Sequence, residues 1–315
     1  MEMNYNADIT DKNEKEIDLS ELFSVLWKGK WLIVSVTSLF SILAILYSLS
    51  LPNIYQSKMI LSPVVSSGGG MNQVMKNMGG LANIAGINLQ SGDSGGNTVK
   101  SLEKLNTLSF FENNILPKIF LPNLMAIDSW SPESNKIIYD KNIYDEATQS
   151  WVRDYEYPRT QIPSAQESFI VFRGHFQVLK DIDTGFVTIT TSHQSPYIAQ
   201  AWAVLIANQL NDFFRTKDQL EAEVAVKYLN AEMAKTSFSE IKLVVAQLLQ
   251  QKVQQLTLIE ASEYYVFDYI DPPAVMETKS GPARSIICII GAFLGGLLGS
   301  LIVIIRFYIM GVKPN

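Results

Sequence analysis

The sequence predicts an α+β membrane protein, in which two transmembrane helices flank an α/β base domain that carries a long helical hairpin arm. Three observations lead to this fold class. Two uncharged apolar segments lie near the ends of the 315-residue chain, short β-like segments follow the first of them, and residues 195–262 show a sustained helical pattern. Charged residues make up 18% of the chain, below the roughly 25% of an average soluble domain.

The two apolar segments, residues 31–51 and 285–305, are each 21 residues long without a charge. At about 1.5 Å per residue, each reaches roughly 31 Å, enough to cross a hydrocarbon core of about 30 Å. The first could instead be a cleaved signal peptide, but a long acidic leader precedes it and no A-x-A-like site ends it. The second could be a buried core helix, but Arg284 and Arg306 bracket it. We therefore predict two membrane spans.

Positive charge near the spans predicts their orientation. Lys28 and Lys30 precede the first span, and Arg306 and Lys313 follow the second. By the positive-inside rule this bias places the leader, residues 1–30, and the tail, residues 306–315, in the cytoplasm. Residues 52–284 then form a domain on the far side of the membrane.

The base of this domain is predicted to comprise residues 52–194 and 263–284. The glycine-rich residues 66–97 also contain regularly placed apolar side chains, which indicates a loop with a short helix inside it. Residues 129–163 are rich in aromatic residues and proline and give no clear assignment. The other predictions are a strand over 54–65 with Pro63 at a sheet edge, a helix from Val99 to about Leu124, and strands at Phe169–Phe172, Phe176–Leu179, Phe186–Thr191 and Tyr264–Ile270.

The arm, about residues 195–262, is predicted to be two antiparallel helices. Ser195-Pro196 places proline at the first helical position, and Ser237-Phe-Ser-Glu240 has the spacing of a capping box for a second helix. A single straight helix would carry the chain roughly 100 Å away from the second span. A hairpin with its tip near Thr236–Ser239 brings it back, although the pattern also allows one kinked continuous helix.

Composition argues against several classes of function. One cysteine cannot form an internal disulfide framework, and a net charge of −6 without basic runs disfavours nucleic acid as a partner. His175 and His193 have no partners at metal-ligand spacing. The chain contains neither a G-x-x-x-x-G-K-[ST] phosphate loop nor a G-x-S-x-G elbow. We therefore predict no enzyme activity, no cofactor and no metal site.

Two sets of residues are candidates for a functional role. Gly291, Gly295 and Gly299 form overlapping G-x-x-x-G repeats, with Gly296 adjacent, a spacing that lets membrane helices approach closely. Asp271, Pro272, Pro273 and Pro282 form a proline linker motif before the second span, which in the simplest interpretation ends a strand and stiffens the chain. Carboxylates along the arm are interpreted as a solvated face; they are Glu221, Glu223, Glu232 and Glu240.

Two pairs of segments next to the spans resemble the Wzz-type O-antigen chain-length determinants, the polysaccharide co-polymerase family. Near the first span they read IDLSELFSVLWKGKWLI (17–33) and PNIYQSKMILSPV (52–64). Before the second they read SPYIAQAWAVLIANQLN (195–211) and EYYVFDYIDPPAVMETKSGPARSII (263–287). The family often has a further proline where this chain has Met276, so the stiffness of the linker differs here.

The resemblance implies a non-enzymatic regulator of lipopolysaccharide O-antigen chain length in the bacterial inner membrane, with cytoplasmic termini and a periplasmic main domain. It also implies a homo-oligomer, in a ring, that works alongside a separate polysaccharide polymerase and meets the growing glycan. Two alternatives stay open. One is a periplasmic adaptor of a secretion or efflux system, and the other is a two-span activator of a cytoplasmic tyrosine kinase.

Overall fold

The computed structural model describes residues 19–64 and 94–308. The predicted leader up to residue 18, residues 66–93 of the glycine-rich segment 66–97 in which a short helix is predicted, and the tail beyond residue 308 lie outside this range. The chain divides into two compact units, residues 1–52 with 281–315 and residues 53–280. Each unit is described by itself.

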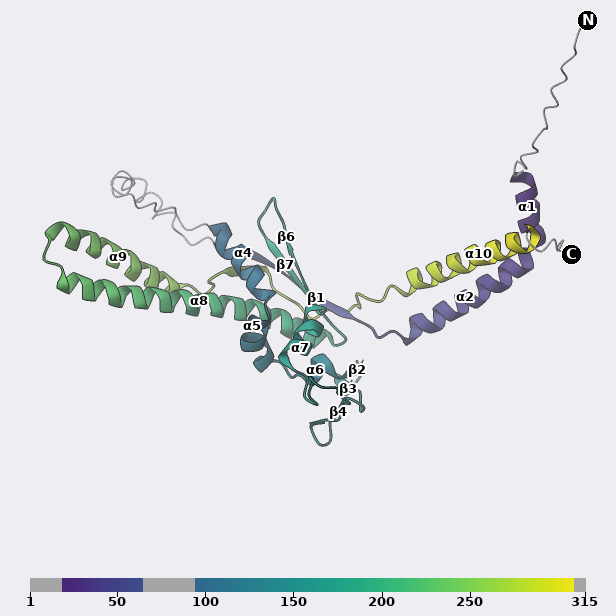
Figure 1. Cartoon of the computed structure of the whole chain (residues 1–315), viewed down its shortest axis with the longest axis horizontal. Coiled ribbons are helices and arrows are strands. Elements are labelled where there is room, and N and C mark those ends of the chain that lie inside the picture. Colours follow the sequence, from purple (N-terminus) through teal and green to yellow (C-terminus); the bar gives the residue numbers. More distant parts are fainter. Residues whose placement is uncertain (1–18, 65–93, 309–315) are drawn as a thin grey trace, which may run out of the picture. The chain divides into compact units, whose positions relative to one another are not determined.

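The first unit is a helix pair preceded by a short helix. α1 (Leu19–Lys28) ends at Gly29, and α2 (Lys30–Ser50) follows directly; α10 (Arg284–Tyr308) lies alongside α2 (Figure 1). Both α2 and α10 are long and apolar enough to cross a membrane. The prediction of two apolar helices at the ends of the chain is therefore confirmed.

The second unit is built on a four-stranded antiparallel sheet. Its order is β6 (Phe176–Lys180), β7 (Val187–His193), β1 (Tyr55–Pro63) and β8 (Phe267–Asp271). Since β1 pairs with both β7 and β8, the prediction of an edge position for Pro63 is wrong. Pro63 lies two residues beyond Leu61, the last residue that pairs with β7, so its missing N–H removes no hydrogen bond from that ladder.

The core lies between this sheet and the first half of α8 (Pro196–Lys235). Alternate β7 residues are buried, as expected for a strand with one face against a core. The helix supplies an apolar stripe at helical spacing. This stripe comprises Ala199, Trp202, Ala203, Ile206, Leu210 and Phe214.

The segment predicted as one helix from Val99 to about Leu124 is mostly helical, but it forms several short helices instead of one. α4 (Ser94–Leu105) stops before Thr107, whose side chain accepts a hydrogen bond from the Phe110 amide and so starts a new helical segment. The pieces are α5 (Leu108–Phe110), the π-helical η1 (Phe111–Ile115), the 3-10 turn η2 (Leu116–Lys118) and α6 (Pro122–Met125).

Two small hairpins lie within residues 127–151, most of them in the segment 129–163 that the sequence left unassigned. β2 (Ile127–Ser131) pairs with β3 (Lys136–Tyr139), and β4 (Tyr144–Asp145) pairs with β5 (Ser150–Trp151). Their aromatic rings make edge-to-face contacts, with ring centroids 5.5 Å apart for Tyr139 and Tyr144. Such short hairpins are held by side-chain packing, because two strands alone are marginally stable in water.

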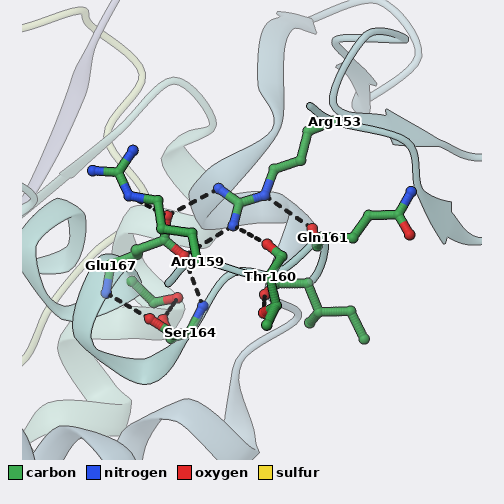
Figure 2. A network of polar contacts seen from close by, with 8 residues as sticks. Arg153, Arg159, Thr160, Gln161, Ser164 and Glu167 are labelled. Carbon is green, nitrogen blue, oxygen red and sulfur yellow. Dashed lines mark hydrogen bonds and ion pairs between the residues drawn. The ribbon is translucent and has the colours of Figure 1, made fainter. Parts of the chain in front are cut away.

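The strand predicted at Phe169–Phe172 is wrong: these residues belong to a helix, α7 (Ala165–Arg173). The Ser164 hydroxyl accepts a hydrogen bond from the Glu167 amide, and the Glu167 carboxylate accepts one from the Ser164 amide. Figure 2 shows this capping box, with Arg153 making two hydrogen bonds to the same carboxylate at 2.9 and 3.1 Å. The Arg153 guanidinium thereby holds the pKa of Glu167 below its usual value. The capping box therefore favours a helix over the strand that the run of four apolar residues predicts.

The arm is a hairpin of α8 and α9 (Ser239–Ala261), which run antiparallel beside each other (Figure 1). This confirms the predicted helix pair and its tip near Thr236–Ser239. The predicted capping box at Ser237–Glu240 is wrong, because Phe238 is the N-cap and no side chain caps the helix. Glu240 is then the second helical residue and lies one position short of a capping-box partner.

Candidate functional site

The glycines of α10 lie against α2 within the first unit. A Cβ atom added at Gly291 would collide with the Cβ of Ala44. At Gly295 it would come within 2.7 Å of the Phe40 Cβ, and at Gly299 within 3.0 Å of the Ile33 Cα. Contacts of this kind need glycine, because any side chain would push the two backbones apart.

Gly296 lies beside this tight line rather than on it. An added Cβ there would meet no atom nearer than the Thr37 hydroxyl, at 3.8 Å. Gly29, which no sequence argument singled out, does lie in a close contact: its added Cβ would come within 2.5 Å of the Val303 side chain. The only signal in the sequence is a lone glycine between Lys28 and Lys30.

Several hydroxyl groups of the helix pair bond to their own helix, whereas the buried Ser48 hydroxyl has no hydrogen-bond partner among the described residues. The Thr37 and Ser41 hydroxyls donate to the carbonyls of Ile33 and Thr37, each at 2.8 Å, and the Ser300 hydroxyl donates to the Gly296 carbonyl at the same distance. Bonds to the carbonyl four residues earlier let hydroxyl groups lie in an apolar environment without an unsatisfied donor. These residues are therefore compatible with a membrane span.

The proline motif divides between the two units. Asp271 ends β8, Pro273 is buried and its carbonyl accepts a hydrogen bond from the Gln200 amide at 3.4 Å. The next carbonyl, of Ala274, accepts from the Ser57 hydroxyl at 2.8 Å. Pro272 is exposed. Pro282 belongs to the other unit, just before α10. The structure thus ties residues 271–274 to α8 and β1.

A polar clamp, comprising Asn211, Arg215 and Asp218, holds the point where the arm returns to the sheet. The Asn211 side chain is 7% exposed; its oxygen accepts from the Val266 and Phe267 amides at 2.8 and 2.9 Å, and its nitrogen donates to the Phe267 carbonyl. The strand predicted to begin at Tyr264 begins at Phe267, where the bonds from Asn211 end. One buried side chain thereby satisfies three backbone groups that would otherwise be unpaired.

The remaining clamp residues act one and two turns further along α8. Arg215 donates to the carbonyls of Ser262 and Glu263 at 2.8 and 2.6 Å, just past the end of α9. The Tyr265 hydroxyl donates to the Asp218 carboxylate at 2.6 Å. Burial, together with that carboxylate, raises the pKa of Tyr265 above its usual value. Sequence reasoning missed the clamp, because its partners lie about 50 residues apart.

The two histidines are structural. The Ser195 amide donates to Nδ1 of His193, so the ring proton lies on Nε2 and is donated to the Asn123 carbonyl at 2.9 Å. Burial lowers the pKa of His193 to about 4. Nδ1 of His175 lies 2.8 Å from the Ser192 carbonyl. Within residues 19–64 and 94–308, no group of three or more potential ligands could hold a metal ion.

The N-terminal part of the chain matches a family model. Residues 15–102 match the family model Wzz, described as "Chain length determinant protein". A search of the curated proteins finds no match.

Two solved structures are similar to the chain. A "full-length bacterial polysaccharide co-polymerase" has a TM-score of 0.42 at 13% identity, and the alignment covers 95% of this chain and 100% of that one. A fragment of the polysaccharide co-polymerase WzzB from Salmonella Typhimurium has a TM-score of 0.32 at 11% identity, with 73% of this chain and 100% of that one covered.

Proposed function

We propose that the protein is a member of the Wzz chain length determinant family, whose model matches residues 15–102, and that it is a non-enzymatic regulator of polysaccharide chain length. The family match is the observation that carries the proposal. The architecture supports it, since two apolar helices bracket a base domain with a helical arm and no catalytic motif stands in the sequence. The regulated polymer would be a lipopolysaccharide O-antigen.

The proposed location is the bacterial inner membrane. In the sequence, six basic residues lie outside the two apolar segments on the side of the termini, and three lie close to them on the loop side. The six are Lys12, Lys15, Lys28, Lys30, Arg306 and Lys313, and the three are Lys58, Lys279 and Arg284. This bias favours cytoplasmic termini. With the leader and tail in the cytoplasm, the domain from residue 52 to residue 284 is periplasmic. The base would then meet the glycan on the side of the membrane where the arm projects.

The two candidate sites would serve this function as structural devices. Gly291, Gly295 and Gly299 let α10 pack closely on α2, which holds the two ends of the periplasmic domain together. Residues 271–274 fix the chain that leaves the sheet. The protein would work as a homo-oligomer, in a ring, next to a separate polymerase that performs the chemistry. Regulation would lie in how the assembly limits or times extension.

A deletion strain tests the proposal. We expect loss of the gene to replace a narrow cluster of glycan lengths on a gel with a smooth decay of short chains, and the wild-type gene to restore the cluster. An unchanged glycan profile would contradict the proposal. If secretion or drug tolerance fell instead, the protein would be an adaptor; if tyrosine phosphorylation fell, it would be a kinase activator.

A further inference from the structure

A groove of about 470 Å³ lies along α8 at the foot of the arm. Six of its lining residues come from α8 and one, Asn114, comes from η1. The α8 residues recur every three to four positions, so they form one face of the helix. They are Gln209, Asp212, Phe213, Thr216, Lys217 and Leu220.

This face is distinct from the clamp. At about 100° per residue, the clamp residues Asn211, Arg215 and Asp218 point to the opposite side of α8 from the groove residues. The clamp face is bound to residues 262–267. The clamp face of α8 is therefore bound to the chain that follows α9, and the groove face is not part of these contacts.

The side chain of Gln209 is the unusual feature of the groove. It is 7% exposed, yet its amide makes no hydrogen bond within the part of the chain that the structure describes. The Gln209 amide atoms are not among the buried side-chain atoms that lack a partner, so they reach the surface of the groove and are free to bond to water or to a ligand. An amide of this kind, lining a cavity, is suited to a hydrogen bond with a ligand.

The other groups of the groove match a hydroxyl-rich ligand. Asp212 and Lys217 take part in no ion pair among the described residues, so an acceptor and a donor are both free. Thr216 and Asn114 add a hydroxyl and a second amide. Phe213, whose ring lies 5.0 Å below the Lys104 ammonium, offers an apolar surface. One carboxylate and one ammonium give the lining no net charge, which does not favour a phosphate.

We propose that this groove binds a short stretch of the polysaccharide whose length the protein regulates. The inference rests on the proposed function for the identity of the polymer. Sugar hydroxyls would pair with the Gln209 and Asn114 amides, Asp212 and Lys217, and the C–H face of a sugar ring would pack on Phe213. The volume falls in the roughly 300–1,000 Å³ range of small-molecule sites, which suits a few sugar units rather than a folded partner.

Binding by the full chain in nanodiscs tests this, with the source organism's surface polysaccharide, cleaved from its lipid by mild acid, as the probe. Gln209→Leu keeps the size of the side chain and removes its amide. We expect affinity to fall about tenfold, the loss for one buried hydrogen bond, while the thermal midpoint stays level or rises. Gln247→Leu, at an exposed position on α9, should change neither affinity nor the glycan profile.

A second variant keeps the test decisive. Thr216→Trp, at an exposed position on α8, should fill the groove and abolish binding without unfolding the protein. Unchanged affinity in both variants would overturn the inference, as would a change in subunit number without a change in affinity, which would make the groove a contact between copies. The proposed function would survive either result if gene deletion still abolished the length cluster.

Discussion

Adding one methyl group at Gly295 should weaken the α2–α10 pair, whereas the same change at Gly296 should not. The two glycines are adjacent, so Gly295→Ala and Gly296→Ala are chemically identical changes in one turn of one helix. At Gly295 the new Cβ would lie 2.7 Å from the Phe40 Cβ and 3.0 Å from the Thr37 Cα. The Thr37 Cα is backbone and cannot rotate away. At Gly296 the nearest atom is 3.8 Å away, an ordinary contact.

The expected magnitude follows from these distances. Overpacking a well-packed contact destabilises it by about 1–3 kcal/mol, so Gly295→Ala should weaken the helix pair by that amount. Gly296→Ala should leave it unchanged, because the nearest atom to the added methyl group is at an ordinary contact distance of 3.8 Å.

A cysteine reporter measures the difference. An ideal Cβ at Gly29 lies 3.2 Å from the Val303 Cβ, so the two positions reach the roughly 3.5–4.5 Å of a disulfide after a shift of a few tenths of an ångström. In a Gly29→Cys, Val303→Cys and Cys288→Ser background, SDS is titrated into the purified protein and brief oxidation reports whether the helices are together. Gly295→Ala should lower the SDS midpoint, and Gly296→Ala should not. Equal midpoints would refute the packing argument.

Three further predictions concern the base domain. Because the pKa of His193 is lowered to about 4 from 6.5, the unfolded chain binds more protons than the folded one between these values; unfolding free energy should therefore drop by about 3 kcal/mol as pH falls from 6.5 to 4, and a flat profile would contradict this. His193→Gln should remove that dependence in urea titrations. Asn211→Ala should destabilise by about 3 kcal/mol, since it leaves buried backbone groups unpaired, whereas the exposed Asn208→Ala should stay within about 0.5 kcal/mol in the same titrations. The pKa of Glu167 is lowered, so its stabilisation is present above its unfolded value and lost as pH falls through the folded one; Glu167→Gln should reduce the thermal midpoint at pH 7 and flatten that acid limb, and an unchanged midpoint would argue against the ion pair with Arg153.

The parts of the fold that depend on local pattern could be predicted from the sequence. The two apolar segments, the start of α8 at Ser195-Pro196 and the turn near Thr236 all follow from composition or from a residue's own backbone preference. The strands β6 and β7 follow from β-rich runs between turn residues.

Two errors in the predicted strands have different causes, one in a local helix signal and one in the pairing of distant strands. Phe169–Phe172 has a strand-like composition, but the S-x-x-E capping box at Ser164–Glu167, a local signal that sequence reasoning overlooked, begins a helix there. Arg153, from another segment, holds Glu167 in place. Pro63 looks like an edge residue until the register with β7 is known.

The candidate sites divide in the same way. The glycine spacing on α10 is visible in the sequence, but which glycine touches α2 depends on the rotation of two helices about each other. Asn211 lies in the middle of an ordinary helical pattern, and only the return of the chain at Val266 gives it a role. The unpartnered amide of Gln209 is likewise a property of the folded chain alone.

The most direct test of the central claim is reconstitution of the polymerase in vesicles with and without this protein. We expect the polymerase alone to make a smooth decay of chain lengths. Adding this chain should produce a peak at one length while the sugar linkages formed by the polymerase stay the same, and this chain alone should make no polymer. A length distribution that does not change when the protein is added would contradict the claim that it regulates polysaccharide length.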